Sequence, residues 1–311
     1  MKKTILTTLL VIAAITVNAQ FLFRINGGGL QKPSYILGSV HTMPGTILDS
    51  IPEFLKAEAE CQQLYAELDL SSQQQMNEVK TAGQQATTLP DGKTIFDMLT
   101  HEQLDALNYR FKETFQMNLT DSAMKGSWNY QPFVFLTTFT LVFTITEMQK
   151  HPELGMAGKP IDAVCIARAQ ERGMTIGQLD QIQSQDSLQK IRNTWMENMD
   201  MQIDSLMSFL EHFDERKQQA IDDVLSAVTV GKYWKSGDYD SFNTDPFWLS
   251  QLEKGSALFK ERNEKWMPKI TDAIQQAPTL FVFGAGHLIG KDGIVNKLRE
   301  AGYQVEQIKT N

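Results

Sequence analysis

Short apolar runs that end at a glycine are the most regular pattern along this chain of 311 residues. The run at residues 34–38 leads into the sequence Gly-x-x-His, and the run at residues 279–284 leads into the same sequence near the other end. Runs of this length, rich in aliphatic and aromatic residues and closed by glycine, predict buried β-strands. Similar patterns predict further strands at about 64–69, 174–180 and 303–308.

Helical patterns lie between these strands. Ser50, Pro52 and Glu53 have the order of a helix N-terminus, and the helix that they begin is predicted to run to about residue 62. A strand, a helix and a second strand predict a βαβ unit with a right-handed crossover. A second unit is predicted from the strand at 279–284 to the end of the chain. We therefore expect an α/β fold in which two βαβ-type halves form a mainly parallel sheet.

The middle of the chain predicts helices. Residues 186–230 have apolar positions spaced three and four apart, and a further helix is predicted at about 247–276. Together they predict a large helical insertion at about 186–276 that covers the cleft between the two halves. Residues 127–146 contain no charged side chain and are strongly apolar, which raises the question of a membrane span. Their marginal length, together with Asn129, Gln131 and several threonines, favours a helix buried between layers.

The first residues predict the compartment. Lys2 and Lys3 precede an apolar stretch, and Val17-Asn18-Ala19 forms a small-residue cleavage site. This pattern predicts a signal peptide at residues 1–19, so the mature domain would be residues 20–311, exported to the periplasm or the extracellular space. No stable membrane span is expected after cleavage. The full chain has a formal charge of −8, and loss of the two lysines makes it −10, which argues against nucleic-acid binding.

The two cysteines are too few for a disulfide framework. Cys61 and Cys165 each fall within or at the end of a predicted helix, where a buried small side chain is favoured over a bridge. An oxidising exterior would still permit one disulfide between them.

His41, His287 and Glu67 all follow predicted strands. In an open parallel sheet ligands bind at the carboxyl ends of the strands, so these three side chains could converge on one site. Two imidazoles and a carboxylate form a recurring site for a divalent metal, which activates a bound water. The alternative is that each histidine only hydrogen-bonds locally at its glycine turn.

Arg262 lies in a helical stretch and could bind a carboxylate through two N–H groups, either that of a substrate or that of Glu67. The alternative is a surface ion pair on a charged helix face. The glycines at 27–29 predict a hairpin or turn before the first strand rather than a phosphate loop, because no Gly-Lys-Ser/Thr follows. The sequence contains no Gly-x-Ser-x-Gly, which leaves a serine-hydrolase triad unsupported.

These motifs, in this order and spacing, resemble those of the TraB/GumN family across nearly all of the mature chain. The matching segments are Gly38-Ser-Val-His41, Glu67-Leu-Asp69, Gly158-Lys-Pro-Ile-Asp162, Gly237-Asp238, Arg262-Asn263 and Phe283-Gly-Ala-Gly-His287-Leu-Ile-Gly290. The family belongs to a wider group with the animal Tiki proteases, which are membrane-tethered and metal-dependent, and with erythromycin-esterase-like enzymes.

The resemblance implies an α/β fold and a site that uses both Gly-x-x-His motifs and the strand-end glutamate. Carried over, the metal ligands are His41, His287 and Glu67, and the pair Arg262 and Asn263 faces the same cleft. The family often has Leu-Glu at the end of the middle strand. This chain has Leu179-Asp180 there, a carboxylate that is one methylene shorter.

The functional hypothesis is an exported metallohydrolase that cleaves peptide or amide bonds of a peptide or other small polar substrate. A divalent ion (zinc, manganese or cobalt) would activate water, and Glu67 would ligate it or act as general base. Arg262 and Asn263 would stabilise the developing negative charge. The alternative is a non-catalytic binding or regulatory protein of the cell envelope that holds a peptide or glycan in the same cleft.

Overall fold

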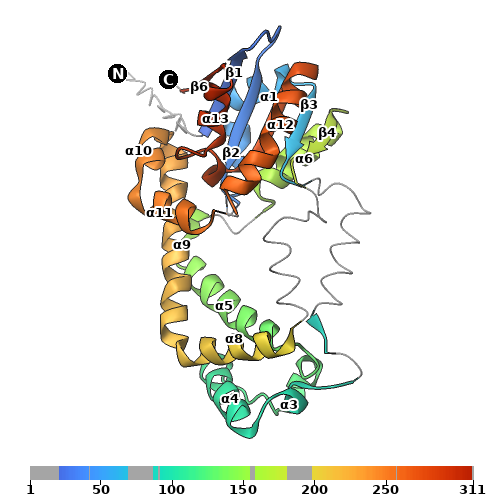
Figure 1. The fold of residues 1–311 in the computed structure, drawn as a ribbon, viewed down its shortest axis with the longest axis vertical. Coiled ribbons are helices and arrows are strands. Elements are labelled where there is room, and N and C mark those ends of the chain that lie inside the picture. The colour runs from blue at the N-terminus through green and yellow to red at the C-terminus, as the bar shows by residue number, and fades with distance from the viewer. Residues whose placement is uncertain are drawn as a thin grey trace, which may run out of the picture.

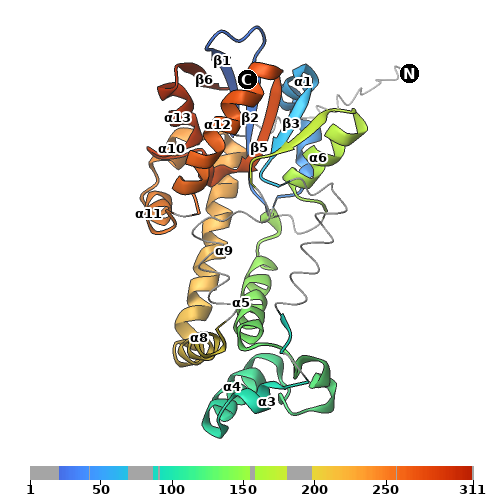
Figure 2. The same cartoon turned by 45° about the vertical axis from the view of Figure 1, so that its right-hand side comes forward.

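The computed structural model describes residues 21–41, 43–68, 87–89, 92–154, 158–180, 198–256 and 258–309. The predicted signal peptide at 1–19 lies outside the described residues, as does the start of the predicted helical insertion. Figures 1 and 2 show a sheet covered by helices at one end and a group of longer helices that extends away from it.

A six-stranded sheet forms the centre of the covered end, in the order β4-β3-β5-β2-β1-β6. The four strands from β4 to β2 are parallel, whereas β1 is antiparallel to both of its neighbours. The predicted α/β fold with a mainly parallel sheet is therefore confirmed. The strands are β1 (Phe21–Gly27), β2 (Ser34–Ser39), β3 (Gln63–Ala66), β4 (Thr175–Gln178), β5 (Thr279–Gly284) and β6 (Tyr303–Gln307).

The strand β1 was not expected from the sequence. Its partner β2 follows the glycine turn at 27–29, so that turn closes a β-hairpin, and the hairpin is antiparallel as its short connection requires. Phe21, Leu22 and Phe23 are fully buried in it. The run is apolar on successive positions rather than alternating, because both faces of this part of the sheet are covered.

The two strands that lead into Gly-x-x-His are neighbours in the sheet. Strand β5 lies between β2 and β3, and it pairs with β2 in parallel so that Gly38 faces Phe283 and Ser39 faces Gly284. All six residues of each strand are buried, as expected for central strands. The two glycine turns therefore leave the sheet side by side at the same edge.

Helices cover both faces of the sheet. From β2 through β3 to β4, each successive strand lies closer to one edge of the sheet. From β4 through β5 to β6, the strands return across the sheet to the opposite edge. With right-handed crossovers the helices of these two halves must lie on opposite faces, as Figures 1 and 2 show. One face has α1 (Pro52–Glu60) and α6 (Ile161–Glu171), and the other has α12 (Lys260–Gln276) and α13 (Ile294–Glu300).

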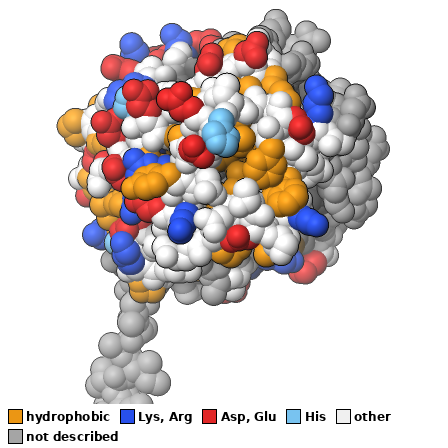
Figure 3. All heavy atoms as spheres, turned by 90° about the horizontal axis from the view of Figure 1, so that it is seen from below, with side chains coloured by type: hydrophobic (Ala, Val, Ile, Leu, Met, Phe, Trp, Pro, Cys, Tyr) orange, Lys and Arg blue, Asp and Glu red, His pale blue; other side chains and the backbone are white. Residues whose placement is uncertain are grey.

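The extended helical part has its own aromatic core. Phe139 of α5 lies against Phe111, Phe209 and Phe213 from three other helices. The helices are α3 (Ile95–Met98), α4 (His101–Phe115), α5 (Pro132–Met148), α8 (Met199–Glu211) and α9 (Phe213–Ser236), with α10 (Tyr239–Thr244) and α11 (Pro246–Lys254) returning to the sheet. Its far end, seen from below in Figure 3, presents acidic, basic and apolar side chains intermixed.

Helix α5 accounts for most of the uncharged segment at 127–146. Phe135, Phe139 and Phe143 are buried at four-residue spacing, whereas Leu141 is exposed on another face. Among the described residues, the structure contains no helix with the length and hydropathy needed to span a bilayer.

Both cysteines are free and buried, as the sequence favoured over a bridge. Burial raises the pKa of the Cys61 thiol to about 12, so it is protonated at neutral pH.

Candidate functional site

Side chains from four parallel strands meet at the carboxyl edge of the sheet. His41 lies two residues after β2, Glu67 directly follows β3, and Asp180 lies two residues after β4. His287 ends the 3-10 helix η4 (Ala285–His287), which directly follows β5. Arg262 reaches the same edge from α12. The topology places the site where open α/β sheets bind ligands.

Glu67 is the centre of this group. Its Oε1 accepts a hydrogen bond from the Gly284 backbone N–H at 2.9 Å and lies 4.0 Å from His41 Nε2. Its Oε2 accepts a hydrogen bond from Arg262 Nη2. Burial alone would raise the Glu67 pKa, but the combined effect of His287, the Arg262 guanidinium and the Gly284 N–H outweighs burial, so the pKa is lowered. Glu67 is an ionised acceptor at neutral pH.

The glycines of the two motifs provide space. A Cβ on Gly284 would lie 3.1 Å from His41 Nε2 and 3.4 Å from Glu67 Oε1, which places this glycine against the site itself. A Cβ on Gly38 would lie 2.3 Å from Leu288 Cδ1, inside the core. The two glycines therefore have the same place in the motif but different neighbours.

His287 is held in one tautomer by Asn263. The Asn263 amide Nδ2 donates to two carbonyl groups, those of His287 and Asp292, which fixes the orientation of the amide. Its Oδ1 lies 2.6 Å from His287 Nδ1, so this nitrogen must carry the proton. The Nε2 atom of His287 is left as an acceptor, and it lies 3.3 Å from Arg262 Nη1.

The surroundings of His287 are apolar and aromatic. The residue is 3% exposed, and its ring lies against those of Trp266, Phe259 and Phe283, at centroid distances of 4.3, 5.2 and 6.2 Å. Burial lowers the pKa of His287 to about 3. The imidazole is therefore neutral over the physiological range, as a metal ligand must be.

His41 has a different environment. Its side chain is 63% exposed, and its Nδ1 lies 2.9 Å from Asp162 Oδ2. The hydrogen bond to Asp162 raises the pKa of His41. Because a carboxylate only accepts, Nδ1 again carries the proton, and Nε2 faces Glu67.

Arg262 connects the carboxylates of the site. Its Nε and Nη2 both donate to Asp180 Oδ2, at 2.9 and 2.6 Å, and Nη2 also donates to Glu67. The guanidinium lies over the Trp266 ring, 4.6 Å from its centroid, and the Trp266 indole N–H donates to Asp180 Oδ1 at 2.6 Å. Despite its shorter side chain, Asp180 thus reaches the site, where it positions Arg262.

The sequence-predicted residues therefore come together at one edge, with different contacts. His41, Glu67 and Arg262 border the site, whereas His287 and Asn263 are almost fully buried behind it, the latter 2% exposed. Three contacting residues were not predicted as site residues: Ser39, Asp162 and Trp266. Asp162 had a signal, since it ends the segment Gly158-Lys-Pro-Ile-Asp162. Ser39 had the same kind of signal, since it lies within the segment Gly38-Ser-Val-His41, whereas Trp266 had none.

The fit to a divalent ion is partial. Ligand atoms lie about 2.0–2.2 Å from zinc, so two ligands of one ion are at most about 4.4 Å apart, which His41 Nε2 and Glu67 Oε1 satisfy at 4.0 Å. Both imidazoles donate Nδ1–H to an oxygen, the arrangement usual for metal-bound histidine. The donor types therefore fit. Arg262 nevertheless contacts two of the three candidate ligands, Glu67 and His287. Among the described residues, no three His, Cys, Asp or Glu side chains are grouped so that they could hold one metal ion.

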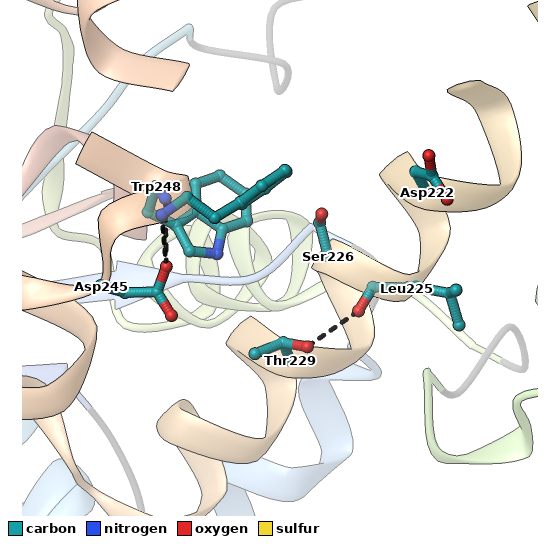
Figure 4. Close-up of a pocket in the computed structure, with 7 residues that line it drawn as sticks. Asp222, Leu225, Ser226, Thr229, Asp245 and Trp248 are labelled. Carbon is teal, nitrogen blue, oxygen red and sulfur yellow. Dashed lines mark hydrogen bonds between the residues drawn. The ribbon is translucent and has the colours of Figure 1, made fainter. Parts of the chain in front are cut away.

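A separate pocket lies between α9 and α11, lined by Ser226 and Thr229 on one side and Asp245 and Trp248 on the other (Figure 4). Its volume of about 210 Å³ is below the roughly 300–1,000 Å³ of small-molecule sites. No residue of the histidine site lines it, so we assign it no role in the chemistry of that site.

The fold and the paired Gly-x-x-His turns place this chain in a known class. The profile of the TraB/PrgY/gumN family matches residues 21–307, so the chain belongs to this family, and the resemblance drawn from its motifs is confirmed.

Curated relatives are more distant. Metalloprotease TIKI2 of Danio rerio is 21% identical over 328 residues, covering 92% of this chain and 60% of the relative. Metalloprotease TIKI1 of Xenopus tropicalis is 23% identical over 318 residues, covering 88% and 59%. The chain therefore spans about three fifths of the length of these relatives. No solved structure matches the chain.

Proposed function

We propose that this protein is a metal-dependent hydrolase that cleaves peptide or amide bonds at the site of His41, Glu67 and His287. The observation that carries the proposal is the state of the two imidazoles. Each donates its Nδ1–H to a fixed oxygen and presents Nε2 as an acceptor, next to an ionised glutamate. The names of the TIKI relatives, which are metalloproteases, support the same reaction class.

His41, His287 and Glu67 are the residues that would hold the ion, of which zinc, manganese and cobalt are candidates. A bound divalent ion would supply a polarised water and a Lewis acid. Asn263 keeps His287 in the required tautomer, and burial keeps it neutral. Arg262 keeps Glu67 ionised, so Glu67 can accept a proton if it is not a ligand.

The guanidinium is also placed to stabilise negative charge that develops on a substrate oxygen. Its contacts with Asp180 and Glu67 fix its position before substrate binds, which is the preorganisation that such stabilisation requires. Asn263 contributes through His287 rather than by direct contact, because its amide nitrogen and oxygen are both engaged. Export of the mature domain through residues 1–19 is part of the proposal.

The test is metal analysis of the purified chain, followed by digestion of a peptide library with and without chelator. We expect about one ion per chain and cleavage that chelator abolishes and added zinc, manganese or cobalt restores. Glu67→Gln keeps the size of the side chain and should remove cleavage. His101→Ala, on the exposed start of α4, is the control and should cleave like the wild type. A folded wild type that binds none of these metals and cleaves nothing would instead favour an envelope binding protein.

A further inference from the structure

We propose that Asp162 is a positioning residue for His41, which holds its imidazole as the Nδ1–H tautomer and directs Nε2 toward Glu67. The metal-binding consequence rests on the function proposed above. The tautomer itself is a property of the metal-free protein.

The Asp162 carboxylate is fixed in one orientation. Asp162 is the second residue of α6, 121 positions beyond His41, and its side chain is 16% exposed. Oδ2 lies 2.9 Å from His41 Nδ1, and Oδ1 accepts a hydrogen bond from the Ser39 hydroxyl at 2.8 Å. Ser39 is the last residue of β2, so one rigid strand holds the carboxylate that orients the histidine following it.

The loop after His41 is fixed to the start of α6 at further points. The Gly45 backbone N–H donates to the Lys159 carbonyl at 2.8 Å, and Pro44 forms an isolated β-bridge with Pro160. A Cβ on Gly45 would lie 2.3 Å from Val164 Cγ2, so the backbone of this loop passes close against α6. Backbone contacts thus set the distance between Asp162 and His41.

The chemistry of the contact explains why it matters. An imidazole as exposed as His41 has few other contacts to choose its tautomer, and in water the Nε2–H form is favoured. That form would direct a proton, not a lone pair, toward Glu67 Oε1, 4.0 Å away. A carboxylate at Nδ1 reverses the preference, because it accepts a hydrogen bond only from Nδ1–H. Asn263 does the same for His287 in a buried setting.

Nitrogen-15 NMR of the metal-free full chain tests this proposal directly. Long-range proton–nitrogen correlations distinguish the two tautomers, and the signal of His41 is assigned by its loss in His41→Gln. At a pH where His41 is neutral, we expect the wild type to be Nδ1–H. Asp162→Ala should convert most of it to Nε2–H, whereas Asp162→Asn, which keeps an acceptor oxygen, should retain Nδ1–H.

Two controls separate positioning from a general effect on the fold. Glu171→Gln removes an exposed carboxylate from the same helix and should leave the His41 spectrum unchanged. The His287 signal should keep its Nδ1–H pattern in every Asp162 variant. A wild type that shows Nε2–H at His41, or an Asp162→Ala that keeps Nδ1–H, overturns the proposal. If Asp162→Ala does not fold, the wild-type spectrum decides alone.

Zinc titration provides the second measurement. We expect Asp162→Ala to bind zinc roughly 10–100-fold more weakly, as is usual when the partner of a metal-bound histidine is removed, and Asp162→Asn to lie closer to the wild type. If the wild type binds no metal, the proposed hydrolase function fails, while the NMR result still decides the role of Asp162. Equal zinc affinity in the wild type and Asp162→Ala, in a zinc-binding wild type, would contradict the metal-binding consequence.

Discussion

The turns after β2 and β5 have the same Gly-x-x-His sequence on adjacent parallel strands, but they place their histidines in opposite environments. His287 is 3% exposed among three aromatic rings and bonded to a neutral amide, whereas His41 is 63% exposed and bonded to a carboxylate. The difference comes from the elements packed on each turn, α12 on one and the start of α6 on the other. A local motif therefore determines where a side chain leaves the sheet, but not its charge state.

The two pKa values move in opposite directions as a result. Burial lowers the pKa of His287 to about 3, and the Asp162 hydrogen bond raises that of His41. Between them, Glu67 Oε1 lies 4.0 Å from His41 Nε2. Glu67 Oε2 accepts a hydrogen bond from Arg262, whose Nη1 lies 3.3 Å from His287 Nε2. The site thus combines the buried, neutral imidazole of His287 with the solvent-accessible imidazole of His41.

The largest effect is expected on activity, where the two histidines should behave alike. If both hold one metal, His41→Ala and His287→Ala should each lower kcat/KM by roughly 10⁴-fold or more, and the double variant should be hardly worse, because residues that act as a unit are non-additive. Steady-state kinetics on a cleavable peptide measures this. Either single variant with full turnover would show that its histidine is structural.

Stability should separate the two histidines. His287→Ala leaves a cavity between aromatic rings and removes the partner of the buried Asn263 Oδ1, so we expect a loss of about 2–4 kcal/mol. His41→Ala, at an exposed position, should cost less than about 1 kcal/mol. Urea unfolding of the metal-free variants gives both values. Equal losses would mean that the difference in burial has no energetic consequence.

The two glycines offer a matched pair of smaller changes. Gly38→Ala forces a methyl group against Leu288 in the core and should destabilise by about 1–3 kcal/mol. Gly284→Ala meets side-chain atoms of His41 and Glu67 at 3.1 and 3.4 Å, so its main effect should be weaker zinc binding with a smaller loss of stability. Thermal unfolding and zinc titration of both variants measure these effects. A larger loss of stability in Gly284→Ala, or weaker zinc binding in Gly38→Ala, would contradict the prediction.

The last expected effect is on the pH dependence of unfolding in the metal-free protein. Because the folded pKa of His287 lies below its unfolded value of about 6.5, its contribution is fully present above pH 6.5 and is lost as pH falls toward 3, by roughly 1.4 kcal/mol per pH unit. His41, with a raised folded pKa, contributes below its unfolded value and loses that contribution as pH rises. His287→Gln should remove the part of the loss of unfolding free energy at low pH that His287 causes. An unchanged acid slope in that variant would contradict a buried neutral His287.

Much of the fold could be predicted because its signals are local. The apolar runs at 34–38 and 279–284, each closed by glycine, were sufficient to predict β2 and β5, and Pro52 marked the start of α1. The predicted cap at Ser50 was wrong, because Ile51 is the N-cap residue and the Ser50 hydroxyl donates to the Ile47 carbonyl. Strand β1 was missed because its apolar run, Phe21 to Phe23, is short and is followed directly by Arg24. Its place in the sheet comes from pairing with β2 and β6 and from packing against Tyr239 and Phe242 of α10, which no local pattern shows.

The sequence by itself determined which side chains stand at strand ends, because the apolar runs, the glycines and the histidines are local features. Only the tertiary structure decided that β5 inserts between β2 and β3 and so brings His287 beside Glu67. It also decided that Asp162 and Asn263 select the tautomers, since each hydrogen bond joins segments far apart in the chain or in different elements. Strand order, burial and hydrogen-bond partners depend on which distant segments pack together, and no local pattern of residues contains that information.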